Sequence, residues 1–183
     1  TISFILFVLV AVGMYFAPAL VRLYAPEFFT TGFETEKEIA IAFTRYCLPQ
    51  IFFLGLFTML GQVANARGSF APLMWAPIAN NIVGIVLFGA FLIFAPSVSI
   101  ANISNIQVQI LGWGTTLSVV VQAMVLVPVI KRLGIKLRPQ WGVKGLGKSF
   151  GLAGWTLIYV LISQLGYLVT VNVATSAAVR SAQ

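Results

Sequence analysis

The sequence predicts an all-α, polytopic transmembrane helix bundle with five spanning helices. Of its 183 residues, 60% are hydrophobic and only 8% are charged, whereas a soluble domain carries about 25% charged residues. Because so few charges cannot cover a surface that faces water, lipid is the expected solvent. A helix needs about 20 mostly apolar residues to cross a bilayer, and no β-barrel alternation is present. Five stretches qualify: residues 2–21, 40–64, 75–95, 107–130 and 151–174.

The first stretch is expected to end near Ala17-Pro18, with Arg22 and Tyr24 at the membrane boundary, where tyrosine is enriched. The loop 22–38 follows and lacks the Asp and Gly positions of a calcium-binding EF-hand loop. We therefore interpret it as a solvated outside loop rather than a cation site. It holds all four acidic residues of the chain, Glu27, Glu34, Glu36 and Glu38.

The second stretch contains Pro49, which predicts a kink near Arg45–Pro49 because proline removes a helical hydrogen bond. Small and polar side chains mark helix–helix interfaces in membranes. We favour such packing over a polar pathway for this helix. The residues concerned are Thr44, Cys47, Gly55, Thr58, Gly61, Gln62 and Asn65.

The third stretch is predicted to begin near Trp75, with Pro77 in its first turn, where a missing N–H costs nothing. It is expected to end at Pro96. The fourth stretch, 107–130, contains Gln122 and Pro128.

The segment 131–148 fixes the predicted orientation, since it holds six of the eleven basic residues. Short loops rich in Lys and Arg stay cytoplasmic. Alternation then places residues 65–74 inside as well, and residues 22–38 and 96–106 outside. Every acidic residue falls outside, as the rule requires. An odd number of spans and a first residue that is not Met lead us to expect a piece of a longer protein.

The fifth stretch is the most polar, and its polar side chains are spaced 3, 4, 4 and 3 residues apart, which is one face of a helix. Two interpretations stay open, a polar cavity wall and ordinary helix packing. Gln164 borders the face. Its members are Thr156, Tyr159, Ser163, Tyr167 and Thr170.

Several other functions are disfavoured by the residues. Gly142–Ser149 matches G-x-x-x-x-G-K-[ST], but no strand precedes it and the chain has no Asp to support Mg²⁺. With no His and no Asp, this chain supplies no metal cluster or catalytic triad. We therefore expect no enzyme activity and no cofactor. The net charge of +7 is attributed to the membrane flanks rather than to nucleic-acid binding.

Residues 61–81 carry a resemblance to a known family. This turn between two spans resembles the MurJ (MviN) family, the lipid II flippases of the MOP exporter superfamily. Other features agree in order and distance, such as Ala17-Pro18, Pro49 and Ser163-Gln164. The matching positions of the turn are Gly61, Asn65, Phe70, Pro77 and Asn81, with Arg67 between them.

The resemblance implies that the chain covers helices three to seven of a protein of about fourteen helices, built as two lobes around a cationic cavity. Residues 1–130 would be four helices of the N-terminal lobe, 131–150 the basic cytoplasmic inter-lobe loop, and 151–183 the first helix of the C-terminal lobe. The family's cavity arginines lie on helices one, two and eight, so none is assigned here. The stripe from Thr156 to Thr170, with Gln164, is the expected cavity wall.

The implied function is translocation of lipid II, an undecaprenyl-diphosphate-linked precursor, from the cytoplasmic to the outer leaflet of the bacterial plasma membrane by alternating access. The implied partners are lipid II, membrane lipids and proteins of cell-wall synthesis and division. Three alternatives remain open. They are another MOP-type exporter of polysaccharide-lipids or drugs, a non-transporting scaffold of cell-wall synthesis, and, for the whole protein, a membrane enzyme.

Overall fold

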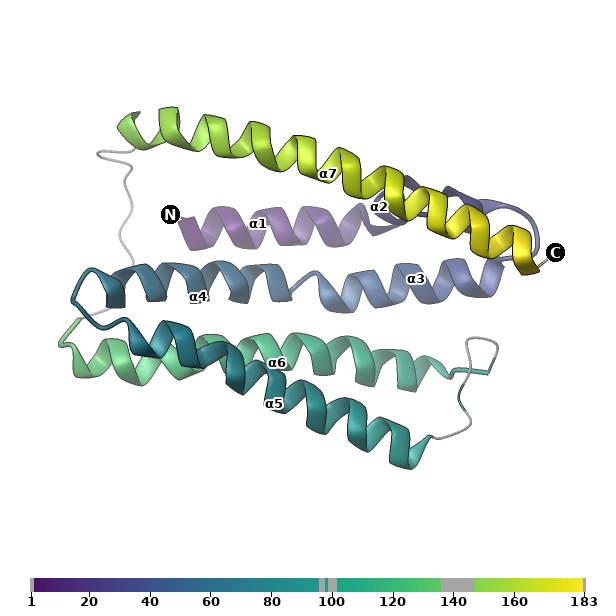
Figure 1. Ribbon diagram of the computed structural model, residues 1–183. Helices are drawn as coiled ribbons and strands as arrows, with labels where there is room; N and C mark the ends of the chain where they lie inside the picture. The colour runs from purple at the N-terminus through teal and green to yellow at the C-terminus, as the bar shows by residue number, and fades with distance from the viewer. Residues whose placement is uncertain (1, 96–97, 99–101, 136–146, 183) are drawn as a thin grey trace.

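The computed structural model describes residues 2–95, 98, 102–135 and 147–182, and every regular element in these ranges is a helix (Figure 1). The prediction of an all-α chain is therefore confirmed. In chain order the elements are α1 (Ile2–Tyr15), α2 (Ala17–Tyr24), the 3₁₀ helix η1 (Pro26–Phe29), α3 (Glu34–Cys47), α4 (Gln50–Asn65), α5 (Ala71–Phe94), α6 (Asn105–Arg132) and α7 (Gly147–Ala182).

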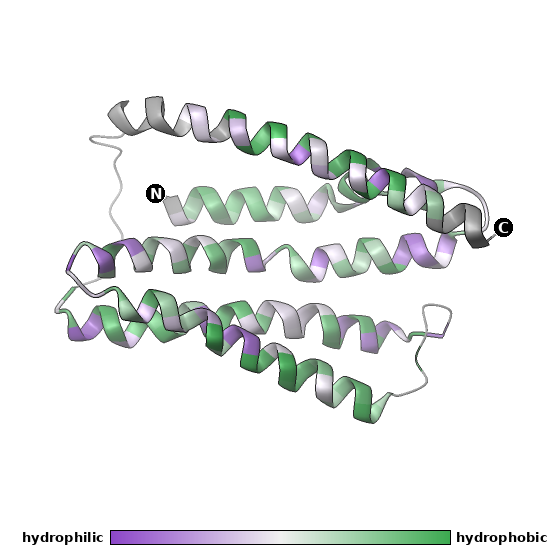
Figure 2. Cartoon of the chain, viewed as in Figure 1, coloured by the Kyte–Doolittle hydropathy of each residue, from purple (hydrophilic) through white to green (hydrophobic). Residues whose placement is uncertain are grey.

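The helices have the length and composition of membrane spans. Figure 2 shows hydrophobic residues along their whole length, with hydrophilic ones gathered mainly near their ends. Within the described residues four spans qualify, and α1 with α2 makes a fifth if this bent pair counts as one. The chain is thus a polytopic membrane helix bundle. The four spans are Glu34–Asn65, Ala71–Phe94, Asn105–Arg132 and Gly154–Ala177.

The first span is bent close to Ala17-Pro18, where the sequence predicted it to end. α1 and α2 are bent by 69° at Phe16. Pro18, in the first turn of α2, has no N–H to donate to the Met14 carbonyl, and its ring crowds that carbonyl. The chain therefore leaves the α1 axis two residues before this proline.

The second span has the predicted interruption, since α3 ends at Cys47 and α4 begins at Gln50, with Leu48 and Pro49 between them. Its start was predicted wrongly, because the helix begins at Glu34, inside the segment interpreted as a loop. Acidic residues in the first turn, here Glu34 and Glu36, favour the positive end of the helix dipole.

The third span also begins earlier than predicted. α5 starts at Ala71, so Pro72 occupies the first turn and Pro77 lies inside the helix. Pro72 therefore occupies the first-turn position that was predicted for Pro77. α6 begins at Asn105, where the Ser104 side chain and Gln107 form a reciprocal capping box.

α6 is the central helix, and it packs against α3, α4 and α5. Buried residues recur along it every three or four positions, which keeps one stripe facing its neighbours. Where α6 meets α4, Leu60 and Ala64 pack against Leu126 and Ile130. The buried stripe of α6 consists of Val108, Gly112, Thr116, Val119, Ala123, Leu126 and Ile130.

A hydrogen bond ties α3 to α6, because the Thr116 hydroxyl donates to the Tyr46 carbonyl oxygen at 2.7 Å. Thr116 is only 3% exposed. We expect Thr116→Val to lower the free energy of unfolding by about 1 kcal/mol, the usual value for one interhelical bond in a membrane protein. Unfolding in mixed detergent micelles measures it. Thr58→Val is the control, since the Thr58 hydroxyl bonds only within its own helix, to the Leu54 carbonyl oxygen. An equal loss in both variants would contradict the prediction.

The connections alternate between the two ends of the bundle. The α4–α5 turn and the C-terminal end of α6 lie at one end, and the α2–α3 connection, the C-terminal end of α5 and the N-terminal end of α6 lie at the other (Figure 1). This arrangement agrees with the alternation on which the predicted orientation depends. Which end faces the cytoplasm stays a prediction.

Candidate functional site

The predicted polar stripe lies on α7, and its members are exposed. The side chains of Tyr159 and Tyr167 are 72% and 61% exposed. The Thr170 hydroxyl donates to the Gly166 carbonyl oxygen of its own helix at 3.0 Å, so its local hydrogen bonding is satisfied. The six exposed side chains are Thr156, Tyr159, Ser163, Gln164, Tyr167 and Thr170. Their aligned hydroxyl and amide groups can hydrogen-bond a polar molecule along about four turns of helix.

A different face of α7 packs against the rest of the chain. α7 contacts α2 and η1, and its half-buried residues recur at intervals of three, one, three and one. With 3.6 residues per turn, this contact stripe lies roughly 150° around α7 from the centre of the polar stripe. Most of the polar stripe therefore faces away from α2. The contact stripe consists of Leu168, Val171, Asn172, Thr175 and Ser176.

Two edge residues of the polar stripe reach α2. The Tyr24 hydroxyl donates to Gln164 Oε1 at 3.3 Å, and the ring centroids of Tyr24 and Tyr167 are 6.3 Å apart. Tyr24 was expected only as a residue of the membrane boundary. Its role in the helix contact could not be read from the sequence, because Tyr24 and Gln164 are 140 positions apart.

Farther along α7, polar contacts reach the segment 23–27. Asn172 Nδ2 donates to the Leu23 carbonyl oxygen at 3.2 Å. The Ser176 hydroxyl donates to Glu27 Oε1 at 3.3 Å. Sequence reasoning missed both pairs. The available indication was that Asn172 and Ser176 are four residues apart and therefore share a helix face.

The family-motif turn is a compact cap between α4 and α5. Gly68 has a φ of +75°, and the Ser69 N–H donates to the Ala64 carbonyl oxygen at 3.0 Å, which closes the end of α4. A Cβ at Gly61 would collide with the Leu73 side chain, so glycine lets the two helices approach.

The other motif positions are spread out. Arg67 and Phe70 are exposed in the turn, whereas Pro77 and the exposed Asn81 lie farther along α5. The Asn65 side-chain oxygen is buried, and among the described residues it has no hydrogen-bond partner. It is available as an acceptor to another segment. The structure does not join this turn to the polar stripe, because α7 packs on α2 and η1 instead.

Arg45 is a cation that the sequence reasoning used only to place a kink. It lies in the last turn of α3, inside the predicted second span, and it is exposed. Ionisable residues within spans are costly and mark substrate paths or polar cavities. Its position inside an apolar stretch could have identified Arg45 as a candidate site residue from the sequence alone.

Among the polar residues of the second span, Cys47 packs against α6, which fits the favoured interpretation, while Thr58 and Gln62 are exposed. Cys47 Sγ lies 3.4 Å from the Thr115 hydroxyl oxygen of α6. The Thr44 hydroxyl donates to the Ala40 carbonyl oxygen of its own helix. These groups are satisfied by helix contacts or locally, so they do not form a continuous polar path.

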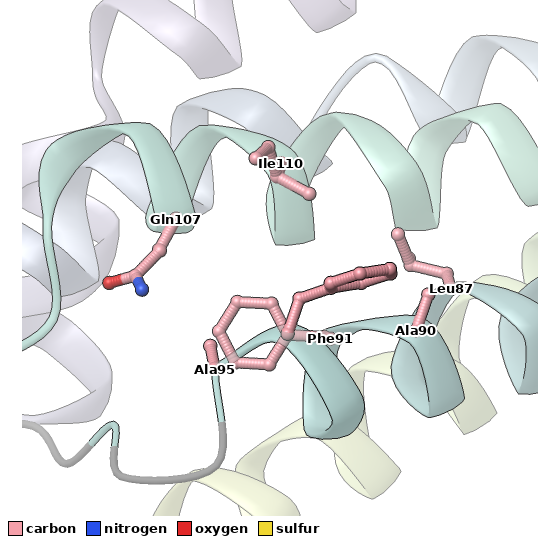
Figure 3. A pocket seen from close by; sticks show the side chains of 7 residues that line it. Leu87, Ala90, Phe91, Ala95, Gln107 and Ile110 are labelled. Atoms are coloured by element: carbon pink, nitrogen blue, oxygen red, sulfur yellow. The ribbon is translucent and has the colours of Figure 1, made fainter.

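A cavity of about 250 Å³ lies between α5 and α6, next to their capped ends (Figure 3). Its walls are apolar, and Gln107 is the polar side chain at its rim. Since Gln107 Oε1 accepts from the Ser104 N–H at 2.8 Å, it belongs to the helix cap. In the parts of the chain that the structure describes, no His, Cys, Asp and Glu cluster could hold a metal ion.

Two sequence features lie outside the described residues. The first is the part of the basic segment 131–148 that follows Ile135, and the second is Gly142–Ser149, which holds the P-loop-like pattern. Of these ranges the structure describes only the start of α7 at Gly147, without its side chains.

Comparison with known proteins gives a consistent result. A family model described as "Lipid II flippase MurJ" matches residues 1–183. The "Probable lipid II flippase MurJ" of Buchnera aphidicola is 24% identical over 143 residues, which cover 78% of this chain and 26% of that protein.

Two further relatives carry the same family name. The "Lipid II flippase MurJ" of Burkholderia cenocepacia is 27% identical over 143 residues, covering 75% of this chain and 26% of that protein. The "Probable lipid II flippase MurJ" of Rickettsia prowazekii is 28% identical over 106 residues, covering 56% and 20%. The chain thus spans 20–26% of the length of these relatives.

Proposed function

Because the chain belongs to the MurJ family of lipid II flippases, we propose that it is part of a transporter that moves lipid II from the cytoplasmic to the outer leaflet by alternating access. In this proposal, α1 to α6 belong to one lobe, the basic segment 131–150 connects the lobes on the cytoplasmic side, and α7 begins the second lobe. At the level of the family the protein is a transporter rather than an enzyme.

The observation that supports this role best is the exposed polar stripe of α7. A diphosphate cannot enter hydrocarbon without partners, because burying an unpaired charge costs many kcal/mol. Side chains such as Ser163 and Tyr167 replace water around the head group, while the polyprenyl tail stays in the bilayer. Since the side chains of the stripe are exposed, they are accessible to such a head group.

Arg45 adds a positive charge that suits an anionic substrate. It lies in a span that is otherwise uncharged from Ile39 onward, and it is exposed. A cation at this depth is stabilised by an anion or by water. We propose that Arg45 faces the polar compartment of the transporter and draws the diphosphate toward it.

Depletion of the whole protein in its bacterium tests the function. We expect lipid II to accumulate in the cytoplasmic leaflet and wall synthesis to stop, because the head group cannot cross unaided. A leaflet-specific assay of the precursor measures the distribution. Re-expression of the intact protein is the control and should restore it. An unchanged distribution would refute the flippase assignment and favour a scaffold or another exporter.

A further inference from the structure

α7 contacts the rest of the described chain mainly from Gln164 onward, against α2 and η1. Between Trp155 and Tyr167, every side chain that the structure describes is exposed. The half-buried stripe begins at Leu168 and reaches Ser176. Figure 1 shows this half of α7 beside α2, while its first half stands apart from α1. The two halves of one helix are therefore in different environments.

The attachment is more polar than the contact between α4 and α6. Tyr24, Asn172 and Ser176 each reach across with one hydrogen bond of 3.2–3.3 Å. The α4–α6 contact instead buries Leu126 and Ile130 completely. Closely packed apolar interfaces behave as one body, whereas a contact made of a few exposed polar pairs can separate where water replaces its partners.

Two donors of this contact have second partners within α7 itself. Asn172 Nδ2 also donates to the Leu168 carbonyl oxygen at 2.9 Å. The Ser176 hydroxyl also lies 2.8 Å from the Asn172 carbonyl oxygen. When α7 moves away, neither group is left without a hydrogen bond, so the opened state carries no orphaned donor at these positions. This is the property that a reversible contact needs.

We propose that Tyr24, Glu27, Gln164, Asn172 and Ser176 form a polar latch, which closes the 22–38 end of the bundle against α7 and must open during each transport cycle. The inference rests on the proposed function, since alternating access requires that one end is closed while the other is open. In the described conformation the latch is closed, and the side chains described between Trp155 and Ser163 are exposed. Tyr24, Glu27, Asn172 and Ser176 position α7, whereas Gln164 also borders the polar stripe.

Cross-linking of the latch in the whole protein is the direct test. In a Cys47→Ser background, Glu27→Cys and Ser176→Cys are joined by a short, reducible bifunctional thiol reagent. We expect lipid transfer in proteoliposomes to fall at least about tenfold, which corresponds to 1.4 kcal/mol on the barrier, and to return after reduction. Continued transfer with the cross-link formed would overturn the latch.

The matched control joins two helices of one packed unit. This control cross-links native Cys47 of α3 to Thr115→Cys of α6. In the native protein, Cys47 Sγ and the Thr115 hydroxyl oxygen lie 3.4 Å apart. Because these helices share the buried interface of α6, their cross-link should leave transfer unchanged. If this cross-link also stopped transfer, the loss at the latch would not be specific, and the proposal would fail.

A distance measurement made without lipid tests the latch independently of lipid transfer. Spin labels at Val63→Cys in α4 and Leu161→Cys in α7, both exposed positions, report the distance between the first half of α7 and the first lobe. Glu27→Gln with Asn172→Leu should shift the distance distribution, and Glu38→Gln, an exposed carboxylate outside the latch, should not. If the protein moves no lipid but the distances shift, the function fails and the latch stands. Unchanged distances overturn the latch.

Discussion

Gly112→Leu is expected to break the contact between α3 and α6 and to destabilise the protein by about 3 kcal/mol or more, at the upper end for overpacked cores. Gly112 is buried on α6, and a Cβ there would lie 2.5 Å from Tyr46 Cβ. Real Cβ atoms are not found so close together. A leucine adds three further carbons to that space.

Tyr46 cannot move aside easily. Its Cβ is bonded to the backbone of α3, and its carbonyl oxygen accepts the hydrogen bond from Thr116. Its ring packs on Trp113, with 5.8 Å between the ring centroids. Relief of the clash therefore requires α3 and α6 to separate, which breaks these contacts as well.

Unfolding of the purified whole protein in mixed micelles measures the loss, and the yield of membrane-inserted protein supports it. Gly84→Leu is the control, because a Cβ at Gly84 meets nothing within 4 Å and both changes replace a helical glycine by the same residue. If the two variants were equally stable, the close approach of α6 to Tyr46 would be wrong.

The spans could be predicted from the sequence because hydropathy depends on composition over about 20 residues. Their ends and bends depend on single residues. Pro18 bends the first span, and Pro72 rather than Pro77 occupies the start of α5. Sequence alone does not say which of two nearby prolines a helix places in its first turn, since tertiary packing decides where the helix begins.

The polar face of α7 could be predicted from the sequence, and its role as a cavity wall stays a prediction. The spacing from Thr156 to Thr170 identified a polar face, and the structure shows these residues exposed. Asn172 and Ser176 were not singled out, because polar residues on a second face of the same helix look alike in sequence. Only the long-range contact with Leu23 and Glu27 distinguishes them.

The central position of α6 could not be predicted from the sequence either. α6 and α7 both contain glycine, threonine and serine within an apolar helix. In α6 the buried Gly112 and Thr116 meet Tyr46 of α3, whereas in α7 Gly154 and Gly166 have open space around them. Small residues permit a close helix approach, but the partner is set by the rest of the fold.

Ser163→Leu combined with Tyr167→Leu is expected to abolish lipid transfer while the fold is kept. Both side chains are exposed on the polar stripe of α7, so apolar replacements add no buried clash. A hydrogen bond to a charged group contributes about 1.5–3 kcal/mol. If both hydroxyls bond the diphosphate during passage, their removal slows transfer about 100-fold or more.

Transfer of lipid II by the whole protein in proteoliposomes measures this loss, and unfolding in mixed micelles checks that stability is kept. Thr58→Leu is the matched control, because Thr58 is also an exposed hydroxyl on a spanning helix but lies on α4, outside the stripe. It should transfer lipid at the normal rate. Full activity of the double variant would show that the polar stripe of α7 does not line the path of the head group. Loss of activity in the double variant alone would place that path along the face of α7 that carries Ser163 and Tyr167.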